Sequence, residues 1–193
     1  MCFMITDKAS FKYFLERDLK AYELDRISFY NYYRMDCVRF QRRLRKIEYL
    51  YNVRQGNMLC RWYRIMLEII NHRLALKLGF SIPKNVFGAG LCLVHYGTIV
   101  VSPLARIGEN CRIHPSSSIG FFNGAPTLGN NVYIGPGAKL FGQIVIGDNV
   151  TIGANAVVNS DIPGNVTVGG IPAKIISNKS SLENDVFPEG LIN

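Results

Sequence analysis

The sequence predicts an α+β chain in three parts: an N-terminal helical domain at 1–80, a left-handed parallel β-helix at 81–177 and a C-terminal tail at 178–193. Apolar residues of the first part recur at helical spacing, whereas those of the second part recur every six residues. The net charge of +8 also lies in the first part, because residues 1–80 hold 16 Lys and Arg against 8 Asp and Glu, while the rest hold 6 of each.

Three helices are expected in the first part. The first begins after Thr6 or Asp7, either of which can cap a helix that buries an apolar face. The second runs over about 28–51 and the third over about 57–78. Gly79 ends the third helix, because glycine readily adopts the left-handed conformation found there.

A period of six marks the second part. Ten aliphatic residues follow this period, interrupted by one nine-residue step: Val101, Ile107, Ile113, Ile119, Leu128, Ile134, Leu140, Ile146, Ile152 and Val158. The next residue is often glycine, and the fourth residue after most of them is small or β-branched. Such a pattern is typical of a triangular solenoid, in which each six-residue unit supplies one side and three units complete a coil.

Composition excludes several classes of protein. The five cysteines are scattered and form no CxxC pair, so we expect neither a metal site nor a disulfide framework. The sequence contains no apolar run of about 18 residues, so no transmembrane helix is expected. The N-terminus lacks the basic and apolar regions of a secretory signal. The scattered cysteines suit reduced thiols, so a cytoplasmic protein is expected.

The segment LVHYGTIVVSPLARIGENCRIH at 93–114 resembles the serine acetyltransferase-like branch of the hexapeptide acyltransferases. The segments IGPGAKLFGQIVIGDNVTIGANAVV at 134–158 and VGGIPAKII at 168–176 are similar to the last coils and closing segment of that branch. The resemblance covers roughly residues 80–177. It implies an O-acetyltransferase that uses acetyl-CoA, forms a homotrimer with its sites between subunits, and employs His95 as general base.

The chemistry of acetyl transfer suits a histidine. A hydroxyl is a poor nucleophile until a base removes its proton, and histidine titrates close to neutral pH. His114 lies close to one coil after His95, so we expect it to contact the acceptor or to orient His95. An acyl-cysteine route through Cys92 or Cys111 is the rival mechanism, although buried cysteines usually serve as small core residues.

The resemblance also implies a set of residues that line acetyl-CoA. These residues are Gly120, Gly135, Pro136, Gly153, Ala154, Pro172 and Lys174. Lys174 would meet a phosphate of the cofactor as a point charge. Each of the others would equally suit an ordinary turn of the solenoid, so structural and cofactor-binding roles both stay open.

Three departures from serine acetyltransferases bear on the acceptor. Val94 stands where they carry an acidic residue, Ala125 stands where a loop histidine is usual, and the tail ends in EGLIN. Serine is a zwitterion and needs charged groups around it. We therefore expect a sugar hydroxyl of a surface or capsular glycan as acceptor, with L-serine as the alternative. A catalytically inactive β-helix scaffold is the alternative of another class.

A basic segment, RFQRRLRK at 39–46, lies among interleaved aromatic residues in the helical part. We expect a solvated face, with the aromatics packed between helices or subunits. Peripheral contact with an anionic membrane, at the inner surface, is the alternative. No nucleic-acid-binding motif accompanies the charge, so no nucleic acid partner is expected.

Overall fold

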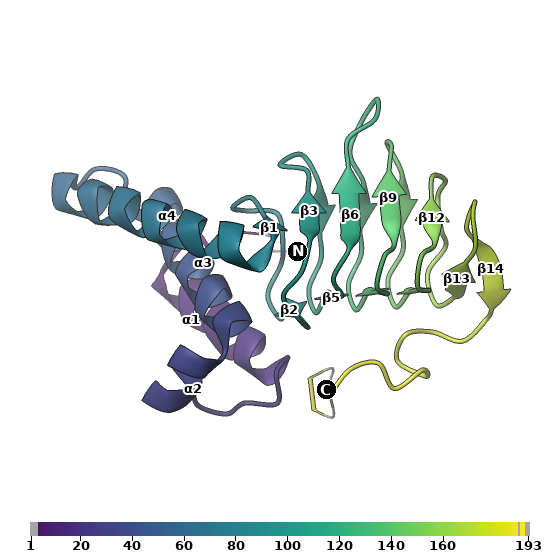
Figure 1. The fold of residues 1–193 in the computed structure, drawn as a ribbon, viewed down its shortest axis with the longest axis horizontal. Helices are drawn as coiled ribbons and strands as arrows, with labels where there is room; N and C mark the ends of the chain where they lie inside the picture. Colours follow the sequence, from purple (N-terminus) through teal and green to yellow (C-terminus); the bar gives the residue numbers. More distant parts are fainter. Residues whose placement is uncertain (1–3, 189, 192–193) are drawn as a thin grey trace.

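The computed structural model describes residues 4–188 and 190–191, and it joins a helical domain to a parallel β-helix (Figure 1). The predicted α+β fold is therefore confirmed. The helices are α1 (Lys8–Lys20), α2 (Phe29–Arg34), α3 (Asp36–Val53) and α4 (Met58–Leu78).

Side chains close to each helix start fix where α1 and α4 begin. Asp7, rather than Thr6, caps α1, because its carboxylate accepts the backbone N–H of Ser10 at 2.7 Å. Asn57 caps α4 in the same way, and Gly79 ends that helix with a φ of 81°. The bounds predicted for the third helix are thus confirmed.

The single helix predicted over 28–51 is wrong. It consists of two helices, α2 and α3, separated by Met35, whose φ of −96° and ψ of 84° are not helical. Ser28 caps α2, and Asp36 opens α3 in the first turn, where a negative charge is favoured by the helix dipole. Apolar spacing continues across Met35, so the pattern of the sequence does not report this break.

Short strands form three sheets, one for each side of the β-helix, named here sides A, B and C. Side A contains β1 (Phe80–Ser81), β3 (Ile99–Val101), β6 (Ser117–Gly120), β9 (Lys139–Phe141) and β12 (Val157–Val158). Side B contains β4 (Arg106–Ile107), β7 (Thr127–Leu128) and β10 (Val145–Ile146). Side C contains β2 (Cys92–Leu93), β5 (Arg112–Ile113), β8 (Tyr133–Ile134), β11 (Thr151–Ile152), β13 (Thr167–Gly169) and β14 (Lys174–Ser177). All pairs are parallel except β13 with β14.

The register confirms the repeat. Leu140 pairs with Val158, eighteen residues later, so three six-residue units make one coil. All ten predicted aliphatic positions are at most 3% exposed and form one continuous core. The predicted small positions are buried too, so both inward columns of the solenoid follow from the sequence.

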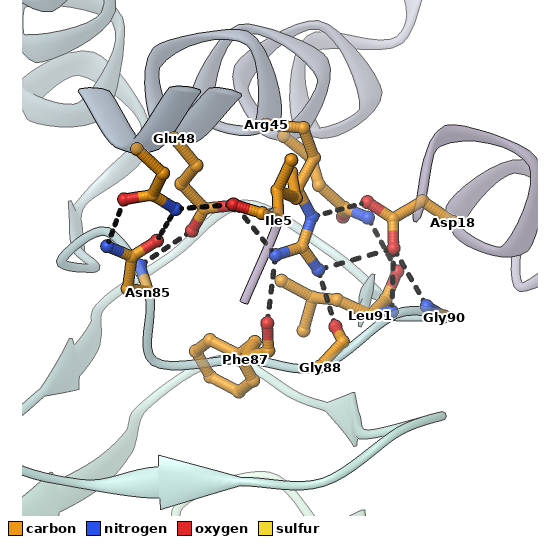
Figure 2. Close-up of polar contacts among 11 residues, drawn as sticks. Ile5, Asp18, Arg45, Glu48, Asn85, Phe87, Gly88, Gly90 and Leu91 are labelled. Atoms are coloured by element: carbon orange, nitrogen blue, oxygen red, sulfur yellow. Dashed lines mark hydrogen bonds and ion pairs between the residues drawn. The ribbon is translucent and has the colours of Figure 1, made fainter. Parts of the chain in front are cut away.

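The helical domain closes the first coil through one buried arginine (Figure 2). Arg45 of α3 has no exposed surface and forms ion pairs with Asp18 at 2.8 Å and Glu48 at 3.0 Å. It also donates to the backbone carbonyls of Phe87 and Gly88 at 2.9 and 2.6 Å. Burial opposes the positive charge, but the two carboxylates outweigh it and raise the pKa of Arg45 above its usual value.

Further side chains satisfy the backbone of this coil. The carboxylate of Asp18 accepts the amides of Gly90 and Leu91 at 2.9 and 3.0 Å, and Gln41 donates to the carbonyl of Leu91 at 2.7 Å. A first coil has no preceding coil to bond, so its backbone groups would otherwise be unpaired. The helices therefore replace the missing coil.

An asparagine ladder forms the corner between sides B and C. Asn110, Asn131, Asn149 and Asn165 all have φ between 55° and 61°, a left-handed conformation that asparagine tolerates. Each side-chain amide donates to the next asparagine of the ladder at 2.7 or 2.8 Å. Arg17 of α1 donates to the first member at 2.7 Å, which ties the ladder to the helical domain.

Close stacking of coils explains some, but not all, of the glycines. A Cβ added to Gly135 would lie 2.8 Å from the backbone nitrogen of Ala154, closer than real contacts allow. A Cβ added to Gly120 would lie 3.8 Å from its nearest neighbour, an ordinary contact distance. Gly135 is therefore required by the coil spacing, whereas Gly120 is not.

Replacement of Arg45 by Met is expected to destabilise the protein strongly. It leaves the carboxylates of Asp18 and Glu48 buried without their cation, which costs about 3–5 kcal/mol. Arg64→Met is the matched control, because its ion pair with Glu68 is partly exposed and contributes less than about 1 kcal/mol. Urea unfolding measures both losses, and equal small losses would contradict the capping role of Arg45.

Gly135→Ala is expected to lower the free energy of unfolding by about 1–3 kcal/mol, because the new methyl group clashes with the adjacent coil. Gly120→Ala is the matched control and should change it by less than about 1 kcal/mol. Thermal unfolding compares the two variants. A Gly135→Ala protein as stable as the wild type would show that coil spacing does not require this glycine.

Candidate active site

The turn from β2 to β3 is longer than its neighbour in the next coil. Five residues join Leu93 to Ile99, whereas three join Ile113 to Ser117. Leu93 pairs with Ile113 and Ile99 pairs with Ser117, so the two turns start and finish in register. Two residues of the first turn therefore have no counterpart on the next coil.

Those two residues are His95 and Tyr96. Val94 still donates its backbone N–H to the coil beneath, and Gly97 lies directly against Pro115, so the extra residues are the pair between them. The side chain of His95 is exposed, and Tyr96 is 73% exposed. The β-helix thus presents the predicted base on an outward bulge at the corner between sides C and A.

His114 occupies the same corner one coil later. Its ring lies 5.1 Å from the ring of Tyr133. Partial burial lowers its pKa, and the nearby charges of Arg112 and His95 lower it further, so the neutral ring is favoured. The predicted proximity of His114 and His95 is present in the structure.

Arg112 and Tyr133 are neighbours of this site that the sequence did not single out. They pair across β5 and β8 on the outer face of side C. Arg112 also contacts the Cys92 sulfur at 3.7 Å. Their positions in the repeat could have identified them. Each directly precedes an inward aliphatic residue, so its side chain points outward, at the strand end that carries His114.

The remaining predicted site residues, with one exception, extend along this corner. In the coil after His114, this corner carries Gly135 and Pro136, and in the next coil it carries Gly153 and Ala154. The segment from Pro172 to Lys174 ends the series, and Lys174 pairs there with Gly169. Strand β14 is five strand positions from β2, or about 24 Å at the usual spacing. An exposed lysine therefore lies at the far end of a line of small residues that begins beside His95.

Gly120 is the exception. It ends β6, at the corner between sides A and B, so it lies across side A from the corner that holds His95. Within one chain, Gly120 cannot line the same surface as Gly135 and Gly153. The nine-residue step in the repeat follows it directly, as the loop 121–126 that projects beyond β6 (Figure 1).

Val94 lies in an apolar environment. It packs beside a cluster of Ala21, Cys92 and Leu191, with Tyr22 and Phe187 as further neighbours. Within residues 4–188 and 190–191, the side chain of His95 has no hydrogen bond or ion pair. The residue before His95 therefore contributes apolar packing and no acidic group.

The other two departures also have a place in the structure. Ala125 is half-buried against the core, while Phe121 and Phe122 of the same loop are 60% and 63% exposed. Of the EGLIN ending, residues 189, 192 and 193 lie outside the described residues. Leu191 is 2% exposed and packs against this chain's own Ala21 and Cys92.

The buried cysteines do not suit covalent catalysis. Burial raises the pKa of the Cys92 thiol to about 12 and raises that of Cys111 as well. The thiolate is the nucleophilic form, so both side chains are unreactive near neutral pH. Across the described residues, no group of three His, Cys, Asp or Glu side chains could hold a metal ion.

Comparisons with known proteins match the β-helix. Residues 125–160 match a family model described as bacterial transferase hexapeptide (six repeats). Serine acetyltransferase of Synechococcus elongatus is 36% identical over 118 residues, which are 58% of this chain and 48% of that protein. The chain spans about half the length of the curated relatives it matches.

Solved structures extend the likeness to most of the chain. Serine acetyltransferase from Brucella abortus in complex with coenzyme A superposes with a TM-score of 0.70 at 26% identity, covering 90% of this chain and 70% of the other. Neisseria gonorrhoeae serine acetyltransferase in complex with serine gives 0.67 at 26% identity, covering 88% and 70%. The chain is thus similar to serine acetyltransferases in its fold and in the sequence of its β-helix, part of which matches the hexapeptide transferase model.

Proposed function

We propose that the protein is an acetyl-CoA-dependent O-acetyltransferase in which His95 is the general base. The observation that carries the proposal is the two-residue bulge that exposes His95 at the head of a corner of small residues. Similarity to serine acetyltransferases, one of them in complex with coenzyme A, supports the choice of cofactor. Along the corner, Gly135, Pro136, Gly153 and Ala154 would line acetyl-CoA, and Lys174 would meet a phosphate.

Acetyl transfer needs few groups. Neutral His95 takes the proton of the acceptor hydroxyl while the hydroxyl oxygen bonds to the thioester carbon. Collapse of the tetrahedral intermediate breaks the carbon–sulfur bond, and the departing thiolate takes the proton from the imidazolium. His114, held neutral beside Arg112, can orient His95 or donate a hydrogen bond to the acceptor.

L-serine is the acceptor that the comparisons favour over the sugar predicted from the sequence. The relatives described above are serine acetyltransferases, and one of them is in complex with serine. Arg112 also provides a cation close to His114, suited to a carboxylate. A glycan hydroxyl stays the second candidate, because apolar packing at Val94 and the uncharged loop at Ala125 remove groups that would bind a zwitterion.

The positions of the predicted site residues at the two edges of side A support a homotrimer with its sites between subunits. His95 lies at the edge that side A shares with side C. Loop 121–126, which projects beyond β6 (Figure 1), lies at the edge that side A shares with side B. Gly120 and the exposed Phe121 and Phe122 can therefore complete a site at His95 only if they come from a second copy. A cytoplasmic location stays a prediction.

Release of coenzyme A thiol with L-serine and with a panel of sugars tests the proposal. We expect turnover with serine, and His95→Ala should lower kcat by about 10²–10⁴-fold, the contribution of a general base. Binding of coenzyme A, measured by calorimetry, should stay unchanged in this variant. His72→Ala is the matched control, because that histidine is exposed on α4, outside the corner.

Each outcome separates the candidates. Turnover with a sugar alone would replace serine by the glycan acceptor. Equal activity in His95→Ala and the wild type would remove His95 as the base. No thiol release together with no coenzyme A binding would contradict the enzyme and leave the inactive scaffold.

A further inference from the structure

A groove of about 440 Å³ on the helical domain is lined by residues from all four helices. Its apolar part includes Leu15 of α1 and Leu67 and Ile70 of α4. Three cations from α3, Arg42, Arg43 and Lys46, line the same groove and are half-buried. These cations belong to the basic segment 39–46, which the proposed acetyl transfer does not use.

Carboxylates do not neutralise these cations. Six of the eight acidic residues in the helical part are engaged elsewhere: Asp7, Glu16, Asp18, Asp36, Glu48 and Glu68. Across the described residues, the side chains of Arg42 and Arg43 have no ion pair or hydrogen bond, while Lys46 lies over the rings of Phe11 and Tyr49. The groove thus keeps a positive charge beside an apolar wall, which suits an anionic amphiphile.

An exposed apolar face of α4 continues from the groove. Leu59 and Trp62 are 79% and 66% exposed, and Met66 and Ile69 are 48% and 53% exposed. They recur at three- and four-residue spacing, on the face opposite the buried Asn71. Ile70 lies on both the face and the groove, so the two surfaces are continuous.

Charge favours a membrane over a second copy on this face. Helix α4 carries Arg61, Arg64, Arg73 and Lys77, and its one acidic residue, Glu68, is held by Arg64 and Lys84. Two such faces together would bring like charges close without compensating carboxylates. A surface of anionic phospholipids supplies both the missing negative charge and an apolar layer. No described helix is long and apolar enough to cross a bilayer, so the contact would be peripheral.

We propose that the helical domain docks on anionic phospholipid membranes through this groove and face. Lipid phosphates bind Arg42, Arg43 and Lys46, while Trp62, Met66 and Ile69 enter the boundary between headgroups and acyl chains. The proposal is independent of acetyl transfer, since none of these residues lies at the corner that carries His95.

Vesicle sedimentation tests the docking. The wild type should sediment with vesicles of phosphatidylcholine containing phosphatidylglycerol, and not with phosphatidylcholine alone. Arg42→Gln with Arg43→Gln should lower the partition coefficient about 25-fold, at roughly a fivefold loss per cation near an anionic surface. The matched control, Arg106→Gln with Lys179→Gln, removes two exposed charges from the β-helix part and tail and should bind like the wild type.

A second variant separates the membrane from a partner copy. Trp62→Ser with Ile69→Ser removes exposed side chains, so it should keep its fold and its size by light scattering while losing vesicle binding. If this variant instead forms a smaller assembly and the wild type ignores anionic vesicles, the face is a contact between copies and the proposal fails. Equal losses in the groove variant and the matched control would also overturn it.

Discussion

The buried pair of Arg45 and Asp18 is the contact on which the two halves of the molecule depend. A parallel β-helix starts with a coil whose backbone groups have no neighbour on one side. Arg45 supplies donors to the carbonyls of that coil, and Asp18 supplies an acceptor to its amides. Tyr22 also pairs backbone groups of this coil, because its hydroxyl accepts the N–H of Leu93 and donates to the carbonyl of Leu93, both at 3.0 Å. The strand that leads into the His95 turn is thus held by the helices.

The C-terminal tail also reaches this strand. At the far end of the β-helix, β14 turns back antiparallel on β13, and the tail then returns past side C towards β2 (Figure 1). Ser181 fixes its course by donating to the carbonyl of Asn131 at 2.6 Å. Leu191 finally packs on Cys92 beside Val94. The exposed His95 bulge is therefore supported by buried polar contacts on one side and apolar packing on the other.

Sequence patterns predict the parts of this architecture that repeat. The ten aliphatic positions follow from the period of six, because inward direction is fixed by the register of each unit. The break at Met35 does not follow, since one non-helical residue leaves apolar spacing unchanged. Arg45 stands in the same basic run as Arg42 and Arg43, so its burial is not visible in the sequence. Gly120 resembles the other repeat glycines, and only the topology assigns it to another corner. Part of the surroundings of Val94 comes from Phe187 and Leu191 of the tail, more than ninety residues away.

Hydrogen–deuterium exchange of the Arg45→Lys variant tests the central claim most directly, namely that the helical domain completes the first coil and so holds the His95 turn. Lysine keeps the charge but lacks the planar fork that reaches two carbonyls and a carboxylate together. The account predicts faster exchange at amides of residues 86–101 and unchanged exchange at residues 150–168. Unchanged exchange over 86–101, or equal acceleration along the whole β-helix, would contradict it.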